Sequence, residues 1–156
     1  MGLDMYLTKK VYVGANYDHN KVTGEINLFK NGNPLPVNMK RVTYIEESVG
    51  YWRKANHIHK WFVNNVQEGV DNCGDYYVSE EKLRQLLTAC QNVVNKPELA
   101  ADELPTQSGF FFGGTEYDQY YIQDCQDTID IIEALLKEKD PGKDYINGEI
   151  YYNSSW

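Results

Sequence analysis

The stretch Gly50–Phe62, GYWRKANHIHKWF, places the strongest constraint on the fold. At about 100° per residue, the apolar positions in it and just beyond it share one arc of a helix. This arc holds Trp52, Ala55, Ile58, His59, Phe62, Val63 and Val66. The pattern predicts a helix that begins near Trp52. On this helix His59 faces inward and His57 faces outward.

Two further stretches have helical periodicity. Ser79 is a good N-cap and is followed by two glutamates, which suit the positive end of a helix dipole; this helix is predicted to stop by Pro97. The other helix is predicted to be capped by Thr115, with Asp118 three residues later as in a capping box, and to run to about Lys137.

Strand signals occur before and after these helices. Leu3–Val13 alternates apolar and polar residues, which predicts a first strand with one buried face. Gly24–Lys30, Arg41–Glu46 and Gly148–Asn153 are further predicted strands, and Asn31-Gly32 is a tight-turn signal. Without βαβ alternation, the order of elements predicts a single α+β domain over residues 1–156. Its mostly antiparallel sheet would be covered on one face by about three helices.

The charge of the chain is unevenly distributed. The net charge is −8, but residues 1–60 carry +4 and residues 61–156 carry −12. An acidic half disfavours binding to nucleic acid or to a membrane surface, because both are anionic. It permits a basic protein partner, and the basic first third could face an anionic ligand. Self-association is left open.

The cysteines and the beginning of the chain point to a cytoplasmic protein. Three cysteines form no CxxC pair, which is typical of a reducing compartment. The opening MGLDMYL lacks the apolar core of a signal peptide, and no apolar run approaches the ~20 residues of a membrane span.

The first predicted helix carries a candidate binding cluster. Arg53 offers a planar fork for phosphate or carboxylate, and Asn56 can recognise an amide or a base edge. Tyr51 and Trp52 could stack on a planar ligand. His59 lies on the apolar arc, where it is either a hydrogen-bonded core residue or a group at the rim of a pocket.

A second dense stretch, LPTQSGFFFGGTEYDQYY, forms a loop that leads into the third predicted helix. Free N–H groups at a helix N-terminus can bind an anion, although the glycine spacing matches neither a Walker A loop nor GxGxxG. A short buried strand is predicted at Phe110–Phe112. The candidate ligand-binding residues of this stretch are Gln107, Ser108, Gly109, Thr115, Tyr117 and Asp118.

No metal site or cofactor is expected. His57 and His59 point their rings about 200° apart on a helix, which is poor geometry for zinc. Cys73 lies in an acidic loop, which disfavours a reactive thiolate, and Ser108 lacks a nucleophile elbow. The sequence therefore assigns no catalytic residue.

Several blocks of the sequence resemble a known family. MGLDMYL, GYWRKANHIHKWFVNNVQEGVDNC, LPTQSGFFFGGTEYDQYY and the closing IYYNSSW are similar to small proteins of bacteriophages and prophages. The resemblance implies the cytoplasm of a bacterial host and an accessory phage role, such as action on host processes or host defence. It carries over no activity and no site residue.

Three functional hypotheses follow. The first is a non-enzymatic protein that binds a small planar anionic ligand, such as a nucleotide, between the first helix and the 105–117 loop. The second is an acidic inhibitor of a host protein. The third is a hydrolase or transferase with His59 as general base and Asp118 as the residue that orients it.

Overall fold

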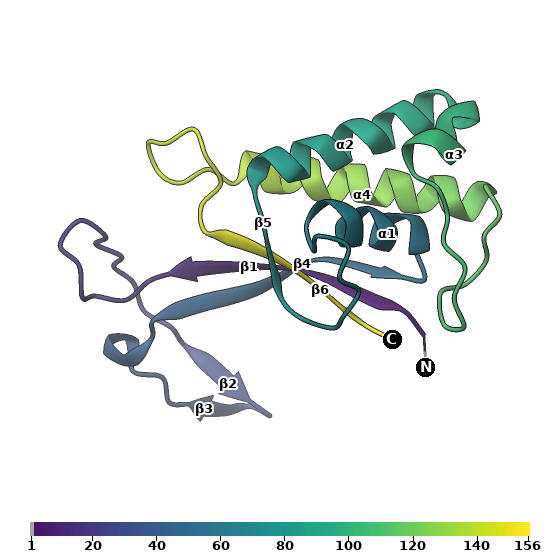
Figure 1. Cartoon of the computed structure of the whole chain (residues 1–156). Helices are drawn as coiled ribbons and strands as arrows, with labels where there is room; N and C mark the ends of the chain where they lie inside the picture. Colours follow the sequence, from purple (N-terminus) through teal and green to yellow (C-terminus); the bar gives the residue numbers. More distant parts are fainter. Residues whose placement is uncertain (1) are drawn as a thin grey trace.

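Helices pack on one face of a curved antiparallel sheet in this computed structural model, which describes residues 2–156 (Figure 1). The fold is α+β, as predicted. The sheet has the order β4 (Tyr44–Arg53), β1 (Asp4–Tyr12), β6 (Glu149–Ser155) and β5 (Tyr76–Val78). The helices are α1 (Asn56–Asn65), α2 (Glu80–Asn95), α3 (Ala100–Glu103) and α4 (Gln119–Lys137). Short 3₁₀ turns lie at Met39–Arg41 and Pro97–Leu99.

The core lies between the sheet and the helices. Met5 and Leu7 of β1 are fully buried, as the alternation in the first strand predicts. Tyr152 of β6 stacks on Phe62 of α1 with ring centroids 3.9 Å apart. Gly50 stands where α4 crosses β4, and a Cβ at this position would lie 3.0 Å from Ile131. A larger residue there would push the helix away from the sheet.

The second helix forms as its local signals predict. Ser79 accepts a hydrogen bond from the backbone of Lys82, and α2 ends before Pro97. Cys90 is fully buried against α4. A contact with Cys125, together with burial, raises the pKa of the Cys90 thiol, so this cysteine is a neutral core residue.

The boundary between β4 and α1 corrects the prediction of a helix from Trp52. β4 continues through Trp52 and Arg53, because Arg53 still pairs with Asp4 of β1. The chain then breaks at Lys54, whose φ is +61°, and α1 begins at Asn56. Sheet pairing thus overrides the helical periodicity at the first two positions.

Two predictions in the second dense stretch are also wrong. Thr115 does not cap the third long helix; Asp118 does, accepting hydrogen bonds from the backbone of Tyr120 and Tyr121. Phe110–Phe112 forms a turn instead of a strand, and Phe110 is 96% exposed. Among the described residues, its only backbone hydrogen bond to the end of β1 runs from the N–H of Leu3 to the carbonyl oxygen of Phe111, at 3.0 Å.

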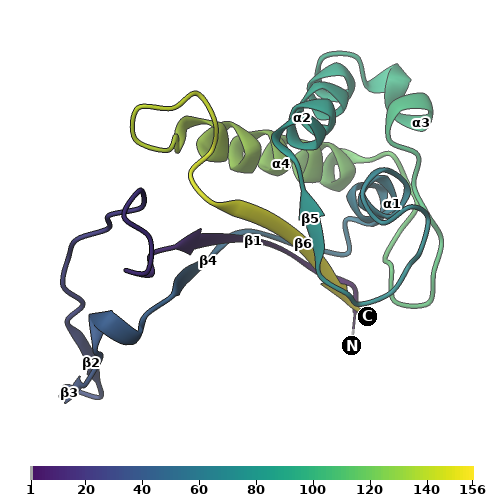
Figure 2. The same ribbon diagram turned by 60° about the vertical axis from the view of Figure 1, so that its left-hand side comes forward.

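A segment near the N-terminus leaves the main sheet. Of the predicted strand Gly24–Lys30, only β2 (Leu28–Lys30) forms. It pairs with β3 (Asn33–Leu35) across the predicted Asn31-Gly32 turn, where both residues have positive φ. This hairpin projects beyond the end of the layer of helices (Figures 1 and 2). Among the described helices, none is long and apolar enough to cross a bilayer.

Candidate functional site

A cleft of about 320 Å³ lies where the end of β4 and the first turn of α1 meet the loop before α4. This volume is at the lower end of the range for small-ligand sites. The loop descends past α1 toward the N-terminus of the chain (Figure 1). The cleft is lined by Arg53, Lys54, Asn56, His57, Thr106, Gly113, Gly114, Glu116, Asp118, Tyr120, Tyr121 and Asp124.

Asn56 holds the loop against α1. Its side-chain amide donates to the carbonyl oxygens of Phe112 and Gly114, at 2.9 and 2.8 Å. Its side-chain oxygen accepts from the backbone N–H of Gln107, at 2.8 Å. Three of its four hydrogen-bonding positions are therefore used inside the protein, and the residue is only 2% exposed. Asn56 shapes the cleft and is not free to recognise a ligand, as the sequence had suggested.

One wall of the cleft is basic. Arg53 and Lys54 come from the β4–α1 junction and line the cleft. The Arg53 side chain leaves β4 on the same face as Tyr51, and its Nε atom is 3.9 Å from Asp4, the carboxylate that also accepts from Tyr51. Helix α1 begins here without a side-chain cap and without an acidic residue in its first turn. The N–H of Asn56 is already bonded to the carbonyl oxygen of Lys54, so this helix end contributes mainly the partial positive charge of the helix dipole to the cleft. This wall suits an anionic group.

The backbone at Lys54 is strained where the loop meets this wall. Lys54 has a φ of +61°, a conformation that non-glycine residues seldom adopt. Gly113, with a φ of +84°, lies directly against it, and a Cβ on Gly113 would be 3.0 Å from the Cβ of Lys54. Only glycine allows this close approach. The loop backbone at Gly113 therefore packs directly against Lys54, with no room for a side chain between them.

The opposite wall is acidic. It contains Glu116 and Asp118 from the loop and Asp124 from the second turn of α4. Burial, with the neighbouring charges of Asp127 and Asp118, raises the pKa of Asp124 to about 7. Asp124 can therefore exist as a neutral acid or as a carboxylate near neutral pH, and a cation or N–H donor beside it would favour the carboxylate.

His57 lies at the floor of the cleft and corrects the expectation that it faces outward. Only 3% of it is exposed, because Tyr121 of α4 stacks on its ring at 4.1 Å. Its Nε2 atom is buried and has no hydrogen-bond partner. Burial lowers the pKa of His57 to about 3, so the ring is neutral near pH 7.

Three predicted residues of the first dense stretch lie away from the cleft. Tyr51 is on the opposite face of the sheet, where its hydroxyl donates to Asp4. Trp52 is buried and donates from its indole nitrogen to Thr128 at 2.9 Å.

His59 is a core histidine. It is fully buried, with Nδ1 2.7 Å from the Tyr152 hydroxyl and Nε2 3.1 Å from Asp71. Both ring nitrogens are engaged, while Asp118 caps α4 instead. The proposed pairing of His59 with Asp118 is therefore wrong.

Several loop residues that were predicted to bind a ligand instead hold the loop in place behind the surface of the cleft. Gln107 donates its backbone N–H to Asn56, and the carbonyl of Thr115 accepts from the Thr106 hydroxyl. The Tyr117 hydroxyl accepts from the backbone of Thr106, and its ring contacts Tyr121 at 5.1 Å. Two further predicted residues, Ser108 and Gly109, do not line the cleft. Of the eleven residues selected, those at its surface are Arg53, Asn56 and Asp118.

Sequence reasoning missed the residues that give the cleft its electrostatic character. They are Lys54, His57, Glu116, Tyr120, Tyr121 and Asp124. Lys54 stands next to Arg53 and extends the same basic pair, so it could have been included. Helical periodicity puts Asp124 on the polar side of α4, and it cannot show that α1 and the loop cover that side.

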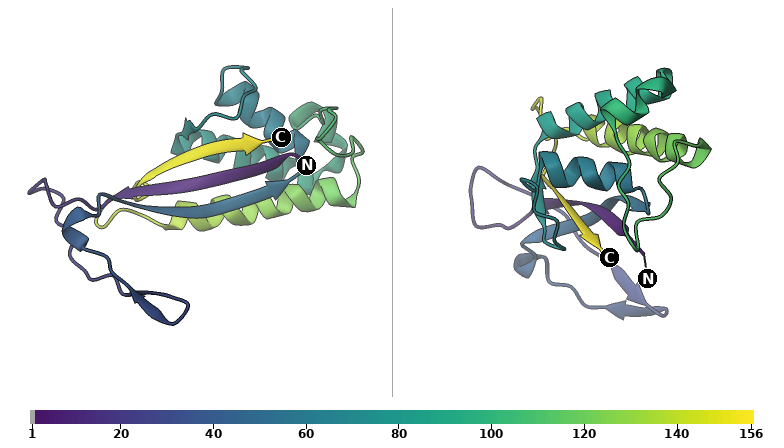
Figure 3. Two further views of the ribbon diagram at one scale, coloured as in Figure 1. Left: turned by 90° about the horizontal axis from the view of Figure 1, so that it is seen from below. Right: turned by 45° about the vertical axis from the view of Figure 1, so that its right-hand side comes forward.

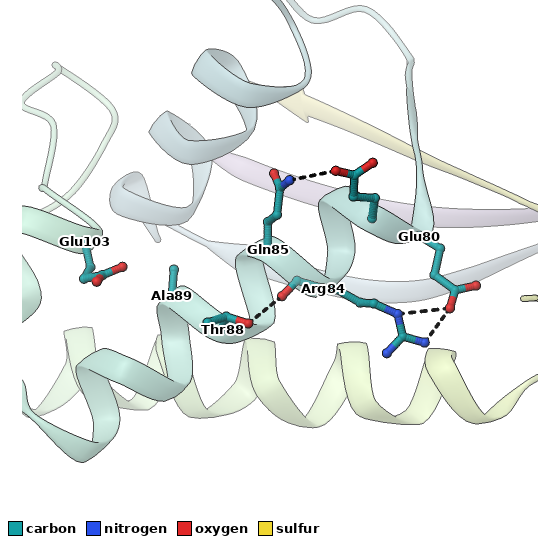
Figure 4. Close-up of a pocket in the computed structure, with 7 residues that line it drawn as sticks. Glu80, Arg84, Gln85, Thr88, Ala89 and Glu103 are labelled. Carbon is teal, nitrogen blue, oxygen red and sulfur yellow. Dashed lines mark hydrogen bonds and ion pairs between the residues drawn. The ribbon is translucent and has the colours of Figure 1, made fainter.

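A larger hollow, of about 700 Å³, lies over α2 but is a less convincing site (Figure 4). All its lining residues except Glu103 of α3 lie along α2, where they bind one another at i, i+4 spacing. Arg84 is 2.5 Å from Glu80, and Gln85 donates to Glu81. Its polar groups are thus satisfied at the surface of a single helix.

No protein-family model, curated protein or solved structure matches this chain. Within residues 2–156, no group of three or more histidine, cysteine or acidic side chains is placed to hold a metal ion. The cleft is therefore the feature of this protein from which a function can be inferred.

Proposed function

We propose that this protein is a non-enzymatic binding protein for a small planar anionic molecule of the nucleotide type. The observation that carries the proposal is the division of one cleft into a basic wall and an acidic wall. An anionic group would bind Arg53, Lys54 and the uncapped N-terminus of α1. Amine hydrogens on a ring would donate to Asp118 and Asp124.

Aromatic side chains support the planar part of this ligand. Tyr120 lies at the cleft and is 72% exposed, so its ring is free to stack on a base. Such stacking contributes about 1–3 kcal/mol per base. His57 has a pKa of about 3 and is a poor proton acceptor near neutral pH, which favours binding over acid–base catalysis. In the phage setting suggested by the sequence, the protein would sequester or sense a host nucleotide.

The direct test is calorimetric titration with a panel of purine and pyrimidine mononucleotides. Arg53→Ala removes a charge-assisted contact, and we expect the dissociation constant to rise roughly tenfold to a hundredfold. Arg41→Ala is the matched control, since it removes the same charge at an exposed residue that does not line the cleft. If no mononucleotide binds the wild type, or if Arg53→Ala binds like Arg41→Ala, the proposal fails.

A second candidate function is inhibition of a basic host protein. Helix α4 carries a row of exposed acidic side chains: Asp127, Asp130 and Glu133. Each accepts a hydrogen bond from a glutamine, and within the described residues none of the three is paired with a basic residue. An exposed acidic row of this kind can bind a basic surface. Pull-down from host lysate should then capture a partner that dissociates with salt. Capture that is unchanged in the double variant Asp127→Asn, Asp130→Asn would contradict this function.

A further inference from the structure

The chain between Ala15 and Val49 contains no buried residue. Within it, residues 15–43 leave the main sheet and are called the arm here. Apolar side chains of the arm are exposed to water, including Leu28 at 47%, Phe29 at 68% and Leu35 at 43%. A lone two-stranded hairpin is only marginally stable in water, and exposed apolar groups of this kind mark contact surfaces. The apolar side chains of the arm therefore have no surface within the described part of their own chain to pack against.

The face of the sheet opposite the helices is also uncovered. Seen from below in Figure 3, left, the strands lie in front of the helices and nothing lies over them. Strand register places six tyrosines on this open face: Tyr6, Tyr12, Tyr44, Tyr51, Tyr77 and Tyr151. Their rings contact in pairs across neighbouring strands, at 5.2 to 6.0 Å. Tyrosine supplies large, rigid, amphipathic contact area at a low cost in conformational entropy.

The β2–β3 hairpin of the arm lies on the same side of the molecule as the open face. Figure 2 shows that β1 and β4 curve and that the β2–β3 hairpin bends away from the helices. The open face thus forms a concave surface with the arm at one end. Because the arm extends beyond the end of the sheet, it does not lie over its own open face. It is free to reach another molecule.

Charge favours a second copy of this chain as that molecule. The arm carries four basic and two acidic side chains, a net charge of +2. Since the whole chain carries −8, the remainder carries −10. The basic arm is attracted electrostatically to the acidic remainder of a second copy. It cannot reach the far end of its own sheet. The net negative charge of the body also disfavours binding of nucleic acid to the tyrosine surface.

We propose that two copies pair by exchanging arms, so that the arm of each lies across the open face of the other. Such a pair has twofold symmetry, because each copy contributes the same arm and the same face. Leu28, Phe29 and Leu35 pack on the tyrosine rings of the partner. Both uncovered surfaces are then buried in one closed assembly, and the candidate cleft on the helix side stays accessible.

The test is the molar mass of the full chain, measured by light scattering and by sedimentation over a range of concentrations. We expect twice the monomer mass of 18.1 kDa. Phe29→Ser should raise the dissociation constant of the dimer at least tenfold, and so should Tyr77→Ser on the open face. Both side chains are more than half exposed within one chain, so circular dichroism should show an unchanged fold.

Phe110→Ser is the matched control. Phe110 is 96% exposed but belongs to the loop before α4, so its loss should leave the dimer unchanged. Mixing the Phe29→Ser and Tyr77→Ser variants should restore part of the dimer, because one intact arm then meets one intact face. A wild type that stays monomeric up to about 100 µM overturns the proposal. A dimer that neither variant weakens also overturns it, as does capture of a different protein on the open face of a monomer.

Discussion

Replacing Asn56 by alanine removes the contact that joins the loop to α1. Three hydrogen bonds of 2.8–2.9 Å are lost, to Gln107, Phe112 and Gly114. A hydrogen bond contributes about 1 kcal/mol net, and a buried group left without a partner costs about 1–3 kcal/mol. The Phe112 carbonyl is buried and keeps the full penalty, while the contacts to Gly114 and Gln107 are partly buried and can regain water. We therefore expect a loss of about 2–4 kcal/mol.

Urea unfolding followed by circular dichroism measures this loss. For a chain of this size, it corresponds to a fall in Tm of roughly 4–16 °C. Asn64→Ala is the control, because Asn64 lies about two turns further along the same helix and is exposed. It should change the unfolding free energy by less than about 0.5 kcal/mol. If Asn56→Ala loses no more than Asn64→Ala, the loop is not held by Asn56 and the description of the cleft is wrong.

A second substitution at the same position separates donor from acceptor. Asn56→Asp keeps the oxygen that accepts from Gln107 but loses both hydrogens donated to Phe112 and Gly114. Near pH 7 its carboxylate would face two carbonyl oxygens, so we expect a loss at least as large as that of the alanine variant. At pH 3 the protonated acid can donate one hydrogen bond, and part of the loss should be recovered. An equal loss at both pH values would contradict the assigned geometry.

Three further predictions concern single side chains and use urea unfolding. The pKa of Asp124 is raised to about 7, so the wild type should lose stability as pH rises from about 4 through 7, and Asp124→Asn should remove this loss. The pKa of His57 is lowered to about 3, so the wild type should also lose stability as pH falls from 6.5 toward 3. His57→Phe should remove that slope, keep the stacking on Tyr121 and gain about 1 kcal/mol at pH 7. Thr128→Val leaves the buried indole N–H of Trp52 without an acceptor and should cost about 1–3 kcal/mol. A pH profile of stability that is unchanged in Asp124→Asn or in His57→Phe would contradict the pKa assigned to that residue. A urea midpoint that is unchanged in Thr128→Val would contradict the hydrogen bond from Trp52.

Local signals were sufficient for parts of the fold. The Ser79 cap and Pro97 stop act within a few residues of the helix they delimit, so α2 could be predicted with its boundaries. The alternation in β1 and the Asn31-Gly32 turn are equally local, and both elements form at the predicted positions. The α+β class followed from the order of these elements along the chain.

The candidate site could be predicted only in outline. The sequence placed Arg53 near the loop before α4, but it selected His59, which the fold encloses in the core. It passed over His57 and Asp124, which lie at the cleft. Periodicity separates an inner face from an outer face on each helix, but it does not show which other segments cover the outer face.

Sequence alone thus determined the elements whose signals are short in range: α2, most of β1, the tight turn and the apolar faces of the helices. Only the tertiary structure decided where β4 ends, because its pairing with β1 holds Trp52 and Arg53 in a strand. It also decided that Asp124 has a raised pKa and that His57 is buried, because both effects come from segments distant in sequence. Burial and electrostatics depend on every neighbour in space, and those neighbours exist only once the chain has folded.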